Sequence, residues 1–179
     1  FDLGISSIQL NNLKRGFSFN SQDKLDMSMG LSNISAEQAI NNLSEKKLKL
    51  IIKILGEEKE ASKIAKNIVR ARAEKKITDV NDLVKIIEKS KKKNFLSKIN
   101  PSTKTFQALR IFVNKEITEL LNGIVKATRL LKPGGKIVIV SFHSIEDRIV
   151  KYFFSNYSKN RSKPSRYFPE NRKNLPLFE

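Results

Sequence analysis

The start of the chain, FDLGISS, reads as the end of a buried strand that runs into a polar turn. Residues 1–3 place an acid between two apolar side chains, and Gly4 opens a loop rich in Ser and Asn. Open α/β sheets bind their ligands at the carboxyl ends of their strands, so Asp2 is predicted to face a ligand. We expect the chain to be a piece of a larger enzyme whose other strands lie upstream.

The charge balance points to a polyanionic partner. The 179 residues include 35 Lys or Arg against 18 Asp or Glu, a formal net charge of +17. Such an excess on a small chain favours nucleic acid, although a Lys-rich genome would also produce it. The chain has no Cys, which excludes disulfides and thiolate metal sites within these residues. It shows neither a secretory signal nor an apolar run of membrane length, so a cytoplasmic location is predicted.

The middle and end of the chain show two kinds of periodicity. Residues 33–90 carry apolar side chains at helical spacing with Ser at the expected starts, Ser35 and Ser44 among them. Residues 105–131 predict a long helix broken near Val113, and KIVIVSF at 136–142 predicts a strand buried on both faces. We expect this strand to lie parallel to the one that ends at Asp2. Ser144 is then expected to cap a last helix.

Four blocks of sequence resemble one family. They are DLGISSIQL with RGFSF at residues 2–19, KLDMSM at 24–29, TFQALRIFVNKEI at 105–117 and LKPGGKIVIVSFHSIEDRIVKYF at 131–153. In this order and spacing they resemble the bacterial methyltransferases that modify the exocyclic N4 of a cytidine in small-subunit (16S) ribosomal RNA. The family's upstream Gly-rich turn and its C-terminal strand pair have no counterpart in these residues.

The resemblance implies an α/β fold, a partial Rossmann-like class I methyltransferase sheet with an inserted all-α domain. Residues 1–22 and 105–155 would belong to the methyltransferase domain, 23–104 to the inserted helical domain, and 156–179 to a basic extended tail. It also implies S-adenosylmethionine as the methyl donor, 16S rRNA within the small ribosomal subunit as the partner, and no metal. A split gene product that only binds RNA is the alternative.

The resemblance assigns donor contacts to Asp2 and to Gln9, the Gln of the SSIQ run. A carboxylate beside a cationic sulfonium lowers the cost of burying that charge. From the residues alone, Asp2 would instead cap the turn and Gln9 would be an ordinary loop residue.

The RNA-binding candidates are Arg15, Phe17, Lys91, Lys92 and Lys93. An Arg beside aromatic side chains suits phosphate contact with base stacking, but Phe17 and Phe19 would serve equally as hydrophobic anchors. The Lys run at 89–98 fits either a phosphate-contacting loop or a solvated linker.

His143 is the only His in the sequence and directly follows the predicted strand. At that position it could accept the proton that leaves the cytosine amine, which makes it the catalytic candidate. The alternative is a structural His in a polar cluster at the start of a helix.

Overall fold

The computed structural model describes residues 1–30, 32, 34–91 and 99–158, and the chain forms two compact units. Residues 5–116 make up the first, here called the helical unit, and residues 1–4 join residues 117 onward in the second, the terminal unit. These contact-based units do not coincide with the predicted domains, since residues 5–22 and α6 (Thr103–Val113) lie in the helical unit, and the domain boundaries remain a prediction. The α6 side chains Phe106, Leu109 and Val113 lie in the same core as the preceding helices.

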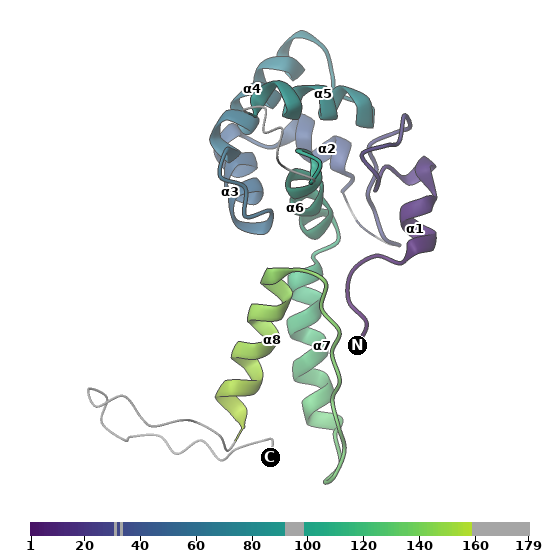
Figure 1. Cartoon of the computed structure of the whole chain (residues 1–179), viewed down its shortest axis with the longest axis vertical. Coiled ribbons are helices and arrows are strands. Elements are labelled where there is room, and N and C mark those ends of the chain that lie inside the picture. Colours follow the sequence, from purple (N-terminus) through teal and green to yellow (C-terminus); the bar gives the residue numbers. More distant parts are fainter. Residues whose placement is uncertain (31, 33, 92–98, 159–179) are drawn as a thin grey trace, which may run out of the picture. The chain divides into compact units, whose positions relative to one another are not determined.

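The helical unit is built around one group of packed helices (Figure 1). Helix α3 lies against α4 and α6, α4 lies against α5, and α2 contacts α4 and α6. Before them come the short helix α1 and a 3-10 turn at Leu13–Arg15. The bounds are α1 Ser7–Asn11, α2 Ala36–Asn42, α3 Glu45–Leu55, α4 Ala61–Glu74 and α5 Val80–Ser90. The helices predicted between residues 33 and 90 are therefore confirmed.

Local sequence explains where these helices begin. Ser35 accepts a hydrogen bond from the backbone N–H of Gln38 at 3.1 Å, and the Gln38 side chain accepts from the Ser35 N–H at 2.9 Å. This reciprocal capping satisfies two donors that a helix start leaves without partners. Ser44 accepts from the Lys47 N–H at 3.3 Å and caps α3 through this one hydrogen bond.

Helices α2 to α5 each bury one apolar stripe. Ile40, Leu48, Ile52, Ile64 and Ile68 are fully buried, together with other members of one core cluster. Full burial of a Leu or Ile side chain stabilises a fold by about 1.5–3 kcal/mol relative to exposure. The helical unit therefore has a hydrophobic core of its own, which is what a domain needs to hold a surface in a fixed shape.

The terminal unit contains α7 (Glu116–Leu130), α8 (Ser144–Tyr157) and an extended segment between them. The break predicted near Val113 is confirmed, because α6 ends there and Lys115 takes a positive φ of 51° before α7. Phe1 packs on α7 at Gly123, where an added Cβ would lie 2.9 Å from the Phe1 ring. Only a residue without a side chain permits this close approach.

The segment predicted as a doubly buried strand, residues 136–142, differs from that expectation. No strand is assigned in the described ranges, and the segment makes one parallel β-bridge, between Val140 and Asp2. A β-ladder needs consecutive bridges, and among the described residues only residues 1–3 pair with the segment 136–142. Val138 and Phe142 are each 69% exposed, so the burial expected of a central parallel strand is not observed.

Gly56 should be sensitive to substitution because it lies where α3 meets α6. A Cβ at this position would lie 2.8 Å from the Ile52 carbonyl oxygen and closer still to the Lys104 carbonyl. We expect Gly56→Ala to lower the free energy of unfolding by about 1–3 kcal/mol, as overpacking does. Urea unfolding measures this, with Ser62→Ala on the exposed face of α4 as the control. Equal midpoints for the two variants would contradict the close packing described here.

Candidate functional site

Asp2 lies in a short parallel pairing between residues 1–3 and 138–140. The Val140 N–H donates to the Phe1 carbonyl at 2.9 Å, and the Leu3 N–H donates to the Val140 carbonyl at 3.1 Å. The terminal ammonium of Phe1 donates to the Val138 carbonyl at 2.8 Å. These bonds confirm the predicted parallel orientation of the two segments. The Asp2 side chain is exposed at the point where its segment turns away.

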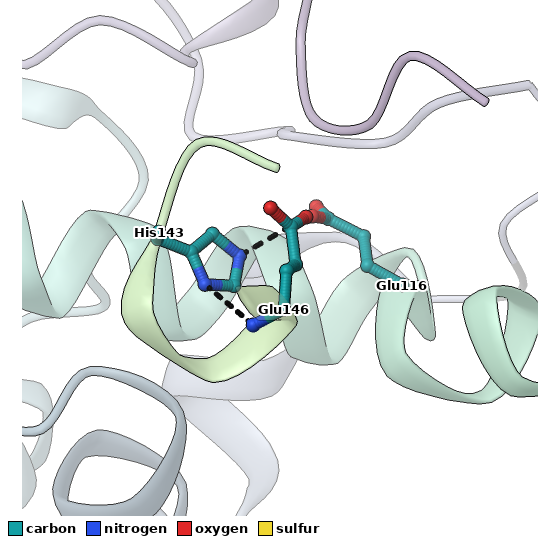
Figure 2. Close-up of side chains that lie close together, drawn as sticks. All are labelled: Glu116, His143 and Glu146. Atoms are coloured by element: carbon teal, nitrogen blue, oxygen red, sulfur yellow. Dashed lines mark hydrogen bonds and ion pairs between the residues drawn. The ribbon is translucent and has the colours of Figure 1, made fainter. Parts of the chain in front are cut away.

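His143 follows the paired segment and is the N-cap of α8 (Figure 2). Its Nδ1 accepts a hydrogen bond from the Glu146 N–H at 3.4 Å, and its Nε2 lies 3.2 Å from a Glu146 carboxylate oxygen. The other carboxylate oxygen of Glu146 accepts from the Phe142 N–H at 3.1 Å. The Glu146 carboxylate therefore contacts both Phe142 and His143, the two residues that precede α8. Glu116, also drawn in Figure 2, forms a two-bonded ion pair with Arg110 at 2.9 and 3.0 Å.

The cap of α8 corrects one expectation and supports another. Ser144 was expected as the N-cap, but His143 fills that position because its ring nitrogen reaches the third N–H of the helix. The polar cluster foreseen as the structural alternative for His143 is thus present. Asp2 and His143 also leave the pairing in the same chain direction, since parallel segments share their polarity.

Gln9 takes part in the start of α1. Its side-chain oxygen accepts from the Ser6 N–H at 2.9 Å, and its own N–H donates to the Ser6 hydroxyl at 3.2 Å. The amide nitrogen of its side chain has no part in this capping box. Donor contact by Gln9 remains a prediction, and that nitrogen is the group that could make it.

The RGFSF block packs into the helical unit. Phe17 is 6% exposed within the core, and Phe19 lies edge-on to Phe106 at 6.4 Å between ring centroids. The guanidinium of Arg15 stacks on the Phe17 ring at 5.2 Å and donates to the Ser28 carbonyl at 2.5 Å. These contacts favour the anchoring role for both aromatic residues, and RNA contact by Arg15 and Phe17 remains a prediction.

Asn114, which the sequence did not single out, holds the KLDMSM segment in place. Its amide nitrogen donates to the Met27 carbonyl at 2.8 Å, and its oxygen accepts from the Met29 N–H at 2.6 Å. Met27 is fully buried with a positive φ of 57°, a conformation that costs about 1–3 kcal/mol and persists only when its surroundings impose it. Arg15 on one side and Asn114 on the other supply that constraint.

Of the three candidates Lys91, Lys92 and Lys93, Lys91 lies within the described residues, and it is internal. Its ammonium lies 2.6 Å from the Glu58 carboxylate and donates to the Pro101 carbonyl at 2.8 Å, with 18% of the side chain exposed. This arrangement ties the end of α5 to the start of α6 and supports a structural role for Lys91. Lys92 and Lys93 lie outside the described residues, so their RNA contacts remain predictions.

The sequence offered one indication of the role of Asn114, which was not predicted. Asn114 lies inside the TFQALRIFVNKEI block and at the predicted helix break, where a C-terminal Asn is a common helix end. Its partners lie more than 80 positions earlier, and spacing along the chain does not reveal them.

Comparison with known proteins identifies the family to which the chain belongs. The model of the MraW methylase family matches residues 1–177, and the chain belongs to that family. It is 44% identical over 177 residues to proteins of Brucella ovis and Brucella suis, both named ribosomal RNA small subunit methyltransferase H. The match covers 99% of this chain and 51% of each relative, so the chain spans about half their length.

The described ranges contain no candidate for a membrane-spanning helix. No helix there combines the length and the apolar character that crossing a bilayer requires.

Replacing Asn114 should release the KLDMSM segment. In Asn114→Ala the Met27 carbonyl and the Met29 N–H lose their partners, which costs about 1–3 kcal/mol for each buried group left unsatisfied. We expect the Met29 amide to exchange with solvent at least tenfold faster, measured by hydrogen exchange. Asn42→Ala, at the exposed end of α2, is the control and should leave Met29 unchanged. Unaltered Met29 exchange in Asn114→Ala would show that the segment holds its shape without the clamp.

Proposed function

We propose that this chain is part of an enzyme that transfers a methyl group from S-adenosylmethionine to the exocyclic N4 of a cytidine in 16S rRNA. Membership of the MraW methylase family over residues 1–177 carries the proposal. The names of the Brucella relatives, which specify ribosomal RNA of the small subunit, support the choice of substrate. The net charge of +17 fits a polyanionic partner.

The reaction is mainly a problem of positioning. The amine of cytosine is a poor nucleophile because its lone pair is delocalised into the ring, so it must be held in line with the methyl group. The methyl donor brings its own leaving group, so transfer to an amine nitrogen needs no covalent protein intermediate. The target base must also be unpaired or turned out of its helix.

Asp2 is the proposed donor-site acid. Its carboxylate is exposed at the carboxyl end of the paired segment, and none of the described side chains forms an ion pair with it. A cation therefore fits there, either the sulfonium or the ammonium of the donor. Gln9 is proposed to add a hydrogen bond from its side-chain amide nitrogen, a group that the α1 capping box does not use.

The proposed fold of the complete enzyme is a class I methyltransferase sheet of Rossmann type. Val138, Val140 and Phe142 expose apolar side chains along the extended segment. Further strands and covering helices would bury them, as central parallel strands require. The finding that the chain spans about half the length of its relatives is consistent with such strands.

For His143 we propose a structural role in the turn that precedes α8. Acceptance of the amine proton by His143 remains a prediction. Its contacts with the Glu146 N–H and carboxylate support a second role, in which it holds the turn that follows the Asp2 partner strand. A neutral ring whose Nδ1 accepts from a backbone N–H carries its proton on Nε2, which cannot then accept another. Accepting a proton would therefore require the ring to move.

Methylation by the complete gene product that contains this chain tests the proposal. Incubation with S-adenosylmethionine and 16S rRNA, followed by nucleoside mass spectrometry, should yield N4-methylcytidine. Asp2→Asn removes a charge-assisted interaction worth about 1.5–3 kcal/mol, so kcat/KM for the donor should fall about 10- to 100-fold. Asp23→Asn, an exposed acid of the helical unit, is the control. A different methylated nucleoside, or equal kinetics for the two variants, would count against the proposal.

A further inference from the structure

Helix α3 presents two different faces. Leu48 and Ile52 are fully buried in the core of the helical unit. The opposite face is exposed and carries Lys46, Lys47, Lys49 and Lys53, with Leu50 and Ile54 among them. Leu50 is 57% exposed and Ile54 is 55% exposed, although both are large apolar side chains. We call this surface the α3 face.

The lysines of the α3 face are available to a partner. None of the described acidic side chains forms an ion pair with them, whereas Lys75, Lys76 and Lys91 elsewhere in the unit are paired. The one acid of the helix, Glu45, lies in its first turn. The face therefore has a local positive charge that its own unit does not neutralise.

The spacing of the lysines matches an extended polyanion. Positions 46, 49 and 53 are three and four residues apart, so they form one row along the helix. Seven residues of helix span about 10 Å, and one strand of a nucleic acid duplex carries a phosphate about every 3.4 Å of axis. A single row can thus reach several consecutive phosphates without any change in the helix.

A neighbouring helix shows that positive charge alone does not set the α3 face apart. The exposed side of α4 carries Lys63, Lys66 and Arg70 at similar spacing, but the acid Glu74 lies among them, and the other exposed residues there, Ser62 and Ala73, are small. That side has the character of a solvated charged surface. The α3 face adds two adjacent apolar side chains, at positions i and i+4, which stay in water unless a partner covers them.

We propose that the α3 face docks the helical unit on ribosomal RNA. Lys46, Lys49 and Lys53 contact backbone phosphates, and Leu50 and Ile54 pack against the faces of unpaired bases or their riboses. Charge complementarity selects RNA over a protein surface, because four lysines of α3 border the apolar pair and the helix itself contains one acid, Glu45. The partner rests on the function proposed above, while the choice of surface rests on exposure and spacing.

Two triple variants, each of which removes three positive charges, test whether the α3 face binds RNA. Complete gene product carrying Lys46→Gln, Lys49→Gln and Lys53→Gln is compared with a control carrying Lys63→Gln, Lys66→Gln and Arg70→Gln. Gln keeps the helix propensity close to that of Lys and Arg. Affinity for in vitro transcribed 16S rRNA is measured across salt concentrations. Loss of three phosphate contacts should lower the slope of log K against log[salt] by about two in the α3 variant, with the control slope nearly unchanged.

A third variant tests the apolar pair. Leu50→Gln with Ile54→Gln should weaken 16S rRNA binding by at least tenfold without changing the salt slope, since no charge is lost. Thermal unfolding of every variant shows whether the helical unit remains folded, which is expected because all substituted side chains are exposed.

The outcomes distinguish a failure of the α3 docking proposal from a failure of the proposed methyltransferase function. If the α3 variant and the α4 control lose equal slope, the α3 face is not the docking surface, and N4-methylcytidine formation still decides the function. If binding is lost on intact small subunits but retained on naked 16S rRNA, the partner of the face is a protein and the RNA proposal is overturned. If the unaltered protein shows no salt-dependent binding to 16S rRNA, the α3 proposal also fails.

Discussion

The parallel pairing of residues 1–3 with residues 138–140 is the interaction on which the placement of the candidate site depends. Three backbone hydrogen bonds bring Asp2 beside Val140, and the turn that follows Val140 carries His143. The capping of α8 by His143 and the bond from the Phe142 N–H to Glu146 then fix the course of that turn. Without this pairing, no contact would hold the segment that carries Asp2 next to the segment that leads to His143.

The helical unit depends on a different principle, a closed apolar core tied together by a few polar side chains. Asn114 and Arg15 hold a segment in which Met27 adopts an uncommon backbone conformation. Lys91 joins the end of α5 to Glu58, between α3 and α4, and to the Pro101 carbonyl just before α6. These contacts keep the unit in one shape while the outer sides of α3 and α4 stay exposed. A rigid core with charged outer faces is suited to hold a large anionic substrate.

Much of this architecture could be predicted because it is encoded locally. Ser35 and Ser44 mark helix starts by side-chain geometry, and the alternation of apolar and charged residues fixes which side of α3 is buried. The parallel relation of Asp2 and Val140 could be expected because both segments run into polar turns, DLGISS and FHSIED. The role of Asn114, the internal pairing of Lys91 and the membership of α6 in the helical unit could not be predicted. They depend on contacts between distant segments, for which neither periodicity nor composition carries a signal.

Donor binding is proposed for residues 1–9 with the turn after Val140, and RNA binding is proposed for α3. Hydrogen exchange on the complete gene product, measured with each ligand alone, tests this division most directly. S-adenosylmethionine is predicted to slow exchange in residues 1–9 and 138–146 and to leave residues 45–55 unchanged, whereas 16S rRNA is predicted to slow exchange in residues 45–55. Protection of residues 45–55 by S-adenosylmethionine, or none in residues 1–9, would contradict the account.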